Sequence, residues 1–124
     1  MGKTKSLIIV ANAFERERQR KTDQPASVMW TRPELTALLN VYGRHVAAGA
    51  WRDYAMADGR QAALFDIFRT SSEMPLYRVE KIPALRRKQG QYVLKGMDGQ
   101  ILRRGHDLQA VLKFFERKNL RLIG

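Results

Sequence analysis

The chain has 124 residues, no cysteine and a formal net charge of +11, and 44% of its residues are hydrophobic. This length fits one domain with its own core, and the apolar content favours a folded chain over a disordered one. The lack of thiols excludes disulfides, thiolate zinc sites and a cysteine nucleophile, and it is compatible with a reducing cytoplasm.

The positive charge is concentrated toward the C-terminal end. Residues 31–80 carry six basic and six acidic side chains, whereas residues 81–124 carry eleven basic and three acidic ones. A basic end on a neutral body is typical of proteins that meet phosphate on nucleic acid or on an anionic membrane, although a solvated surface has the same composition. No stretch approaches the ~20 apolar residues of a membrane span, so we expect a soluble, cytoplasmic protein.

In chain order, residues 1–27 are predicted to form a basic, partly mobile leader. The segment FERERQRKTDQPAS is highly charged and ends in loop-forming residues, a composition that does not build a packed core. From residue 28 to residue 124 we expect a single α+β domain.

The first helix is predicted over residues 32–48. Thr31 and Glu34 fit the two ends of a capping box, and Gly49 is a natural stop. Pro33 is preorganised in the first turn. The apolar residues that recur at helical spacing, and that we expect to form one buried face, are Leu35, Leu38, Leu39, Tyr42 and Val46.

A β-hairpin is predicted next, because WRDYAMA and RQAALFDIFR flank the turn-forming pair Asp58-Gly59. A two-residue turn would pair Tyr54 with Ala63 and Arg52 with Phe65. One face of the sheet would then carry Tyr54, Met56, Ala63, Phe65 and Ile67, and the other would carry Trp51, Leu64 and Phe68. Apolar groups on both faces predict a helix on one side and a partial cover or a partner on the other.

The remaining segments complete an antiparallel meander. PLYRVEKI is predicted to be a third strand, PALRRKQG a break closed by Gly90, and QYVLK and QILRR a second hairpin around Asp98-Gly99. From about Asp107 to Asn119, apolar residues at helical spacing predict a second helix. The predicted fold is α+β, an antiparallel meander of about five strands with an N-terminal and a C-terminal helix packed on it.

Four blocks, YGRHVAAGAWRDYA, FRTSSEMPLYRVEK, RRKQGQYV and ILRRGHDLQAVL, follow one another along the chain. Together they resemble the signature blocks of a small uncharacterised bacterial family, known mainly from alphaproteobacteria as a domain of unknown function. The resemblance runs from Thr31 to Phe115, although ADGRQAALFD around the first hairpin is less typical. It implies a bacterial, cytoplasmic protein, and it brings no activity, cofactor or catalytic residue.

Catalytic and metal chemistry find little support in the residue pattern. His106-Asp107 resembles a base with its orienting acid, but adjacent side chains at a helix start diverge. Asp107 fits better as a helix cap, with Gly105 as the hinge before it. The two histidines, His45 and His106, lie on different elements without metal-ligand spacing. We therefore expect a protein that is not an enzyme and has no catalytic residue, metal or cofactor.

The basic C-terminal third predicts contact with nucleic acid, DNA or RNA, through the phosphate backbone or through shape. Gly105 and the helix start after it offer backbone N–H groups to phosphate, and Arg103 and Arg104 alternate across a strand, so they point to opposite faces. Tyr77 or Tyr92 would either stack on a base or, as we favour, pack in the core. The predicted contact residues are Arg86, Arg87, Lys88, Lys95, Arg103, Arg104, His106, Lys113 and Arg117.

The alternative function is that of a protein-interaction module. Its evidence is the second apolar sheet face of Trp51, Leu64 and Phe68, on which a second copy would form a homodimer. In that case the basic end would meet an acidic protein partner. A stable dimer that buries Trp51 would favour this alternative over nucleic-acid binding.

Overall fold

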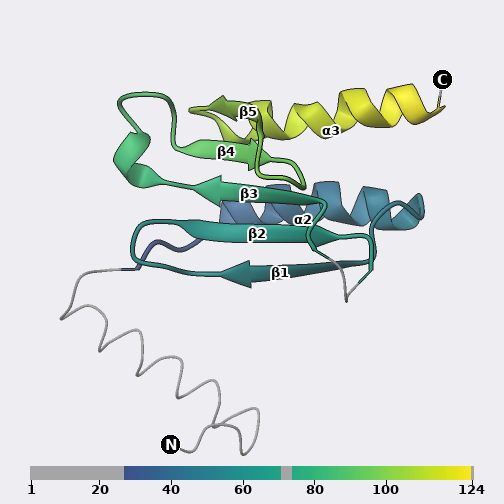
Figure 1. Cartoon of the computed structure of the whole chain (residues 1–124), viewed down its shortest axis with the longest axis horizontal. Helices are drawn as coiled ribbons and strands as arrows, with labels where there is room; N and C mark the ends of the chain where they lie inside the picture. Colours follow the sequence, from purple (N-terminus) through teal and green to yellow (C-terminus); the bar gives the residue numbers. More distant parts are fainter. Residues whose placement is uncertain (1–26, 71–73, 124) are drawn as a thin grey trace, which may run out of the picture.

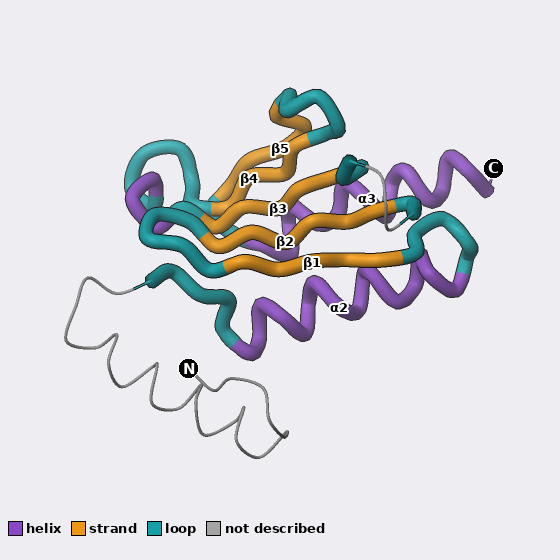
Figure 2. The backbone as a smooth tube through the Cα atoms, turned by 60° about the horizontal axis from the view of Figure 1, so that its bottom comes forward, coloured by secondary structure: helices purple, strands orange, loops and turns teal. Residues whose placement is uncertain are grey.

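One antiparallel sheet with two helices on the same face makes up the described part of the protein (Figure 1, Figure 2). The structure is a computed structural model that describes residues 27–70 and 74–123, with side chains described as far as Glu116. Its elements are α2 (Arg32–Ala47), β1 (Asp53–Ala57), β2 (Ala63–Phe68), β3 (Tyr77–Lys81), the 3-10 helix η1 (Pro83–Leu85), β4 (Tyr92–Lys95), β5 (Ile101–Gly105) and α3 (Leu108–Ile123). The strands pair in the order of the sequence, so the predicted α+β meander is confirmed. The predicted leader lies outside the described residues, except for residue 27.

Helix α2 begins at the predicted capping box. The backbone N–H of Glu34 donates to the Thr31 hydroxyl at 3.3 Å, and the backbone N–H of Thr31 donates to the Glu34 carboxylate at 2.8 Å. These bonds satisfy N–H groups near the helix start that have no partner within the helix, and such a cap stabilises a helix by about 1 kcal/mol. Pro33 lies in the first turn, where an N–H is not needed.

The buried face of α2 differs from the predicted one. Leu38, Val41 and His45 are buried, whereas Leu39 and Val46 are 38% and 40% exposed. The apolar residues of this helix span a wider arc than its neighbours cover, so helical spacing does not decide which part of the arc turns inward. Leu39 and Val46 leave apolar surface along the outside of α2.

The first hairpin has a longer loop than predicted. Tyr54 pairs with Ile67, four residues from its predicted partner Ala63, and Arg52 does not pair with Phe65. A shift by an even number of residues leaves every side chain on its own face of the sheet. The prediction that Tyr54, Met56, Ala63, Phe65 and Ile67 share one face of β1 and β2 is therefore confirmed, although the predicted register is wrong.

The glycine expected in the tight first turn serves another contact. Gly59 is not among the glycines with positive φ, so it does not form the predicted two-residue turn with Asp58. Its carbonyl accepts the N–H of Val28 at 2.6 Å, in an isolated antiparallel bridge. The contact with Val28, which precedes α2, takes the place of the tight turn that the Asp58-Gly59 pair predicted.

The second hairpin and the last helix agree better with the prediction. β4 and β5 flank Gly99, whose φ of +85° suits the turn, and the loop closes through a bond from the Gly96 N–H to the Gln100 carbonyl. α3 extends beyond its predicted end near Asn119, to Ile123. Neither helix in the described residues is long and apolar enough to cross a membrane.

Aromatic side chains fill the core between the sheet and the helices. Trp51, which is 4% exposed, stacks on the His45 ring at 4.1 Å and meets Phe115 of α3 edge to face at 5.0 Å. Trp51 therefore does not join Leu64 and Phe68 on the second face of the sheet, and its prediction as part of an interaction face is wrong. It precedes β1, so the alternation of strand side chains does not apply to it.

Charged pairs cover much of the sheet face that carries no helix. Arg78 on β3 donates to both carboxylate oxygens of Asp66 on β2, at 2.7 and 2.9 Å, and Lys95 on β4 pairs with Glu80 at 3.1 Å. We call this surface the open face; its side chains are Asp53, Ala55, Ala57, Leu64, Asp66, Phe68, Arg78, Glu80, Val93, Lys95 and Arg104. Because Leu64 and Phe68 lie among these ion pairs and are only partly exposed, the open face is not a continuous apolar surface.

Candidate nucleic-acid interface

Both helices begin at the same end of the strands, where β3 and β5 finish and where β2 and β4 start (Figure 1). We call this end of the sheet the rim edge, which is distinct from the edge strands β1 and β5. Tyr92, the first residue of β4, pairs with Gly105, the last residue of β5. Lys81, the last residue of β3, pairs with Ala63 of β2 and bonds Glu34 in the first turn of α2. The chain before α2, the β1–β2 loop, η1 and the β5–α3 junction therefore meet at one edge.

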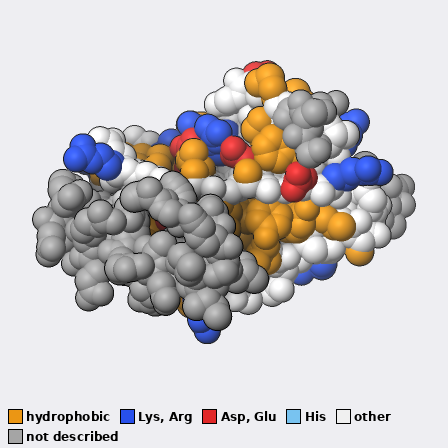
Figure 3. Space-filling model, turned by 90° about the horizontal axis from the view of Figure 1, so that it is seen from below, with side chains coloured by type: hydrophobic (Ala, Val, Ile, Leu, Met, Phe, Trp, Pro, Cys, Tyr) orange, Lys and Arg blue, Asp and Glu red, His pale blue; other side chains and the backbone are white. Residues whose placement is uncertain are grey.

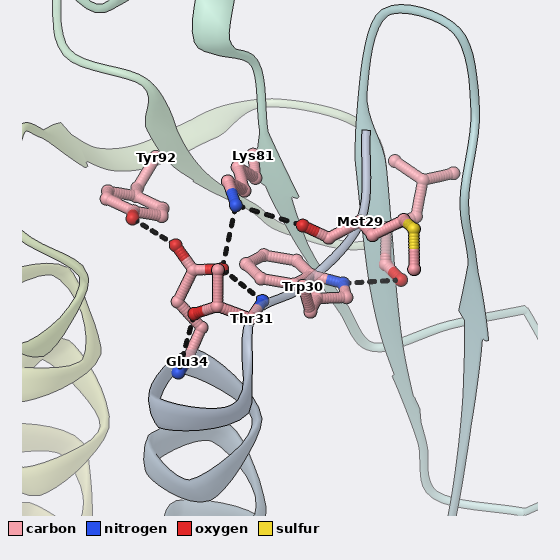
Figure 4. Close-up of polar contacts among 7 residues, drawn as sticks. Met29, Trp30, Thr31, Glu34, Lys81 and Tyr92 are labelled. Atoms are coloured by element: carbon pink, nitrogen blue, oxygen red, sulfur yellow. Dashed lines mark hydrogen bonds and ion pairs between the residues drawn. The ribbon is translucent and has the colours of Figure 1, made fainter. Parts of the chain in front are cut away.

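A largely buried polar cluster holds this edge together (Figure 4). The Glu34 carboxylate accepts the Thr31 N–H, the Lys81 ammonium at 2.9 Å and the Tyr92 hydroxyl. Lys81 also donates to the Met29 carbonyl at 2.9 Å. The side chains of Lys81 and Glu34 are only 12% and 13% exposed, so loss of either partner leaves a charge with little water around it.

The cluster shifts the titration of two of its members in opposite directions. Burial raises the pKa of Glu34, but the hydrogen bonds from Tyr92, the Thr31 backbone and Lys81 together lower it by more, so this pKa lies below its ordinary value. Burial raises the pKa of the Tyr92 hydroxyl well above its ordinary value, and the Glu34 carboxylate raises it further. Glu34 is thus ionised and Tyr92 is protonated at neutral pH. Because neither group changes its charge there, we assign the cluster a structural role.

The turn after η1 is held against the β5–α3 junction by a close backbone approach. Gly90 has φ +95°, and a β-carbon at this position would lie 2.4 Å from the carbonyl carbon of Gly105. Only glycine leaves room for this contact and adopts this φ without strain. The contact places the turn over residues 85–90 next to the junction at residues 105–107.

Exposed basic side chains line this edge. We call them the basic rim: Arg32, Arg60, Arg86, Arg87, Lys88 and His106. The last four belong to the predicted contact set, and the structure brings them together. Among the described residues, the ion pairs hold Arg44, Arg78, Lys81 and Lys95, and no member of the rim.

Two residues of the basic rim, Arg32 and Arg60, are missing from the predicted set. Arg32 is the first residue of α2 and Arg60 lies in the β1–β2 loop, so both fall in the part of the sequence whose net charge is zero. The position of Arg60 could have been predicted from the meander, because alternate loops of a meander lie at the same end of the strands. Asp58 and Asp107 are exposed at this edge as well and offset part of its charge.

Two other predicted contact residues, Lys95 and Arg104, lie on the open face and away from the rim cations. Lys95 ends β4 at the opposite edge of the sheet and is held by Glu80. Arg104 faces Val93 across the strands, and one of its guanidinium nitrogens is buried without a hydrogen-bond partner among the described residues. Neither side chain is placed to join a phosphate contact at the rim.

The last three predicted contact residues belong to α3 or lie against it. Arg103 points to the face opposite Arg104, as predicted, and donates to the Ala110 carbonyl in the first turn of α3 at 3.3 Å. Lys113 is exposed on the outer side of α3. The side chain of Arg117 lies outside the described residues.

Asp107 caps α3, as predicted. Its carboxylate accepts the Gln109 N–H at 3.2 Å, and its carbonyl accepts the Val111 N–H at 3.1 Å. A carboxylate at this position occupies the positive end of the helix, where a phosphate would otherwise bind. The predicted use of this helix start for phosphate is therefore disfavoured, and the exposed cations of the rim are the better candidates.

Both tyrosines considered for base stacking pack in the core. Tyr92 is 8% exposed, and Tyr77 meets the ring of Phe115 edge to face at 4.9 Å. The preferred prediction, core packing, is confirmed for Tyr92, and Tyr77 is partly buried against the core. The basic rim thus offers charge and hydrogen-bond donors, and these two aromatic rings are not available at it for stacking.

Comparison with known proteins identifies a family and adds nothing about activity. No curated protein and no solved structure matches the chain. One family model matches residues 28–112, which span α2, the whole sheet and the first turn of α3. The match begins where the predicted leader ends and covers more than half of the sequence. The chain therefore belongs to the family described as protein of unknown function (DUF2794).

Proposed function

We propose that the protein is a non-enzymatic protein of the bacterial cytoplasm that binds nucleic acid at the basic rim, through phosphate groups. The observation that carries this proposal is the segregation of charge. Arg78 and Lys95 on the open face are paired with Asp66 and Glu80, whereas Arg86, Arg87 and Lys88 follow one another in one turn and are exposed with no ion-pair partner among the described residues. Unpaired cations grouped at one edge attract a polyanion.

The chemistry of the rim favours backbone recognition over base reading. Arginine offers planar paired donors that suit phosphate oxygens, and lysine adds a point charge. The sequence has no helix-turn-helix, zinc-finger or RNA-binding aromatic motif to read base edges. We therefore expect weak sequence preference and strong salt dependence.

The test is a salt titration of binding by the full chain. Fluorescence anisotropy with a short labelled DNA duplex, and with an RNA duplex and single strands of the same sequence, gives the affinity at each salt concentration. Replacing Arg86, Arg87 and Lys88 together by alanine should weaken binding to every probe. It should also reduce the slope of log affinity against log salt on DNA by about 3, because each lost phosphate contact removes about 0.9.

A charge-matched control separates a local site from net charge. Arg44, Arg52 and Arg69 are exposed and lie near the opposite ends of α2, β1 and β2, so their replacement by alanine removes the same charge at the other edge. We expect this control to keep most of the affinity. Equal losses in the two triple variants, or no binding by the unmodified chain at low salt, would refute the proposal.

The alternative, an interaction module with an acidic protein partner, is tested in the same assay. An interaction through the open face is less well supported, because Trp51 is buried in the core. The basic rim, however, would also bind acidic side chains of a protein partner. Polyglutamate added as a competitor distinguishes the two partners. Displacement of the nucleic acid at equal charge concentration favours an acidic protein, whereas resistance to displacement favours phosphate.

A further inference from the structure

Strand β1 is an edge strand whose only charged residue is Asp53, at its first position. It stands first in the sheet order, and its sequence Asp-Tyr-Ala-Met-Ala has no lysine, no proline and no bulge. Exposed edges are normally blocked by such features, because their free N–H and C=O groups pair with other chains. The Tyr54 N–H donates to the Asp53 side chain, and the carbonyl of Ile67, which is paired with Tyr54, accepts from Leu76 beside β3, so the main chain of Tyr54 faces outward. By the alternation of antiparallel pairing, Met56 faces outward too.

An apolar strip runs beside this edge, along the seam between β1 and α2. Tyr54 and Met56 are 37% and 47% exposed, and the outward-turned residues of α2 are Leu39 and Val46. Tyr42 of α2 contacts the Tyr54 ring edge to face at 4.8 Å. A shallow pocket of about 280 Å³ continues the strip between Leu35 and Met56. Figure 3 shows an apolar patch on this side of the molecule.

We propose that β1 pairs with β1 of a second copy, which joins two sheets into one and buries the apolar strip. A two-fold axis through Ala55 gives the longest overlap of two antiparallel five-residue strands. Tyr54 then lies opposite Met56 of the partner, and the outward main-chain groups of both residues form the hydrogen bonds. Ala55 faces Ala55 of the partner on the side away from the helices, where its small side chain causes no clash.

The charge around the edge favours a second copy over a charged partner. Residues 31–80, which contain α2, β1 and β2, carry six basic and six acidic side chains, so two copies meet there without net repulsion. The proposed register places Asp53 opposite Ala57 and not opposite its own copy, which avoids a like-charge pair. The basic rim, by contrast, lies beyond the end of β1.

The N-terminal segment, residues 1–26, is the other candidate to cover β1. The antiparallel bridge between Val28 and Gly59 sets the direction of the chain there. Val28 itself thus pairs with the loop after β1 and not with β1, and a monomer in the mass measurement below would count in favour of the N-terminal segment.

Single cysteines test the proposed register, since the chain contains none of its own. Ala55→Cys should form an intermolecular disulfide under mild oxidation, because Cα atoms of directly opposed, non-hydrogen-bonded residues lie about 4.5 Å apart. Ala57→Cys is the matched control on the same strand and face. Its two copies would lie about 14 Å apart along the strands, which is too far for a disulfide. Equal cross-linking of the two variants, or none of Ala55→Cys, overturns the register.

Molar mass by light scattering tests the dimer itself. The unmodified chain at micromolar concentration and physiological salt should scatter at twice its 14.3 kDa. Met56→Lys should shift it to the monomer, because the new charge would be buried opposite Tyr54 of the partner. Met97→Lys, at an exposed methionine of the β4–β5 loop, should remain a dimer. A monomeric unmodified chain, or a dimer that survives Met56→Lys, overturns the proposal whatever the outcome of the nucleic-acid assay.

Discussion

The Glu34→Gln variant tests whether the buried polar cluster holds the rim edge together. Glutamine keeps the size of the side chain but removes the charge that Lys81 faces at 2.9 Å. Its single carbonyl oxygen must replace two carboxylate oxygens that accept from Thr31, Lys81 and Tyr92. At least one of these donors is left without its acceptor, in a place that water barely reaches.

The expected loss of unfolding free energy follows from the burial of the pair. Breaking a buried pair by removing one partner costs about 3–5 kcal/mol. The pair is not fully buried and Lys81 keeps its bond to the Met29 carbonyl at 2.9 Å, so we expect at most the lower end of this range, about 3 kcal/mol. For a domain of this size, that corresponds to a fall in Tm of roughly 10 °C.

Urea denaturation followed by circular dichroism measures this loss, and a second glutamate provides the control. Glu116 pairs with Arg44 at 4.0 Å, with side chains that are 61% and 55% exposed. Such exposed pairs contribute about 0–1 kcal/mol, so Glu116→Gln should be nearly neutral. Equal effects of the two substitutions, or a loss below about 1 kcal/mol for Glu34→Gln, would show that the cluster is not a stabilising buried pair.

The difference in stability between the unmodified chain and Glu34→Gln should depend on pH. The pKa of Glu34 is lowered in the folded state, so the stability that its charge contributes is present above the ordinary carboxyl pKa of 4.5. It is lost as the pH falls through the lower folded-state value. The gap between the unmodified chain and Glu34→Gln should therefore be constant near neutral pH and close below about pH 4.5. A gap that widens in acid would contradict this assignment.

Three further substitutions probe the same edge. Tyr92→Phe removes a hydroxyl donor to the Glu34 carboxylate and should lower the unfolding free energy by about 1.5–3 kcal/mol in urea denaturation. Gly90→Ala should destabilise more than Gly99→Ala in the same assay, because both have positive φ but only Gly90 approaches another backbone; equal losses would contradict the close approach. Asp107→Asn should keep the cap of α3 and yet tighten nucleic-acid binding in the anisotropy assay, because it removes a negative charge beside the rim; unchanged affinity would place the ligand elsewhere.

Local chemistry predicted those parts of the fold that local contacts determine. The capping box of Thr31 and Glu34 and the turn at Gly99 both appear where short-range rules place them. The first hairpin did not follow its turn signal, because the Gly59 carbonyl bonds Val28, which is distant in sequence. The faces of β1 and β2 still came out correctly, because the side-chain period of two tolerates an even shift.

The buried face of α2 and the composition of the rim depend on three-dimensional neighbours. Val46 and Val41 are equally apolar, and only the position of the sheet and of α3 makes one exposed and the other buried. Charge counting along the sequence found Arg86 and its neighbours but overlooked Arg32 and Arg60. These two residues lie at the same rim edge, but they belong to a segment with no net charge. A linear reading also grouped Lys95 with them, although the open face holds it in an ion pair.

The order of the strands has a consequence for how the chain folds. Every strand pairs with its neighbour in sequence, so the hairpins close short loops and can form early. The contacts that attach α2 join residues 47 and 58 positions apart, in Glu34 with Lys81 and with Tyr92. If these contacts form after the transition state, their loss should speed unfolding and leave the folding rate nearly unchanged. On this view the basic rim is completed last in folding and opens first when the domain begins to unfold.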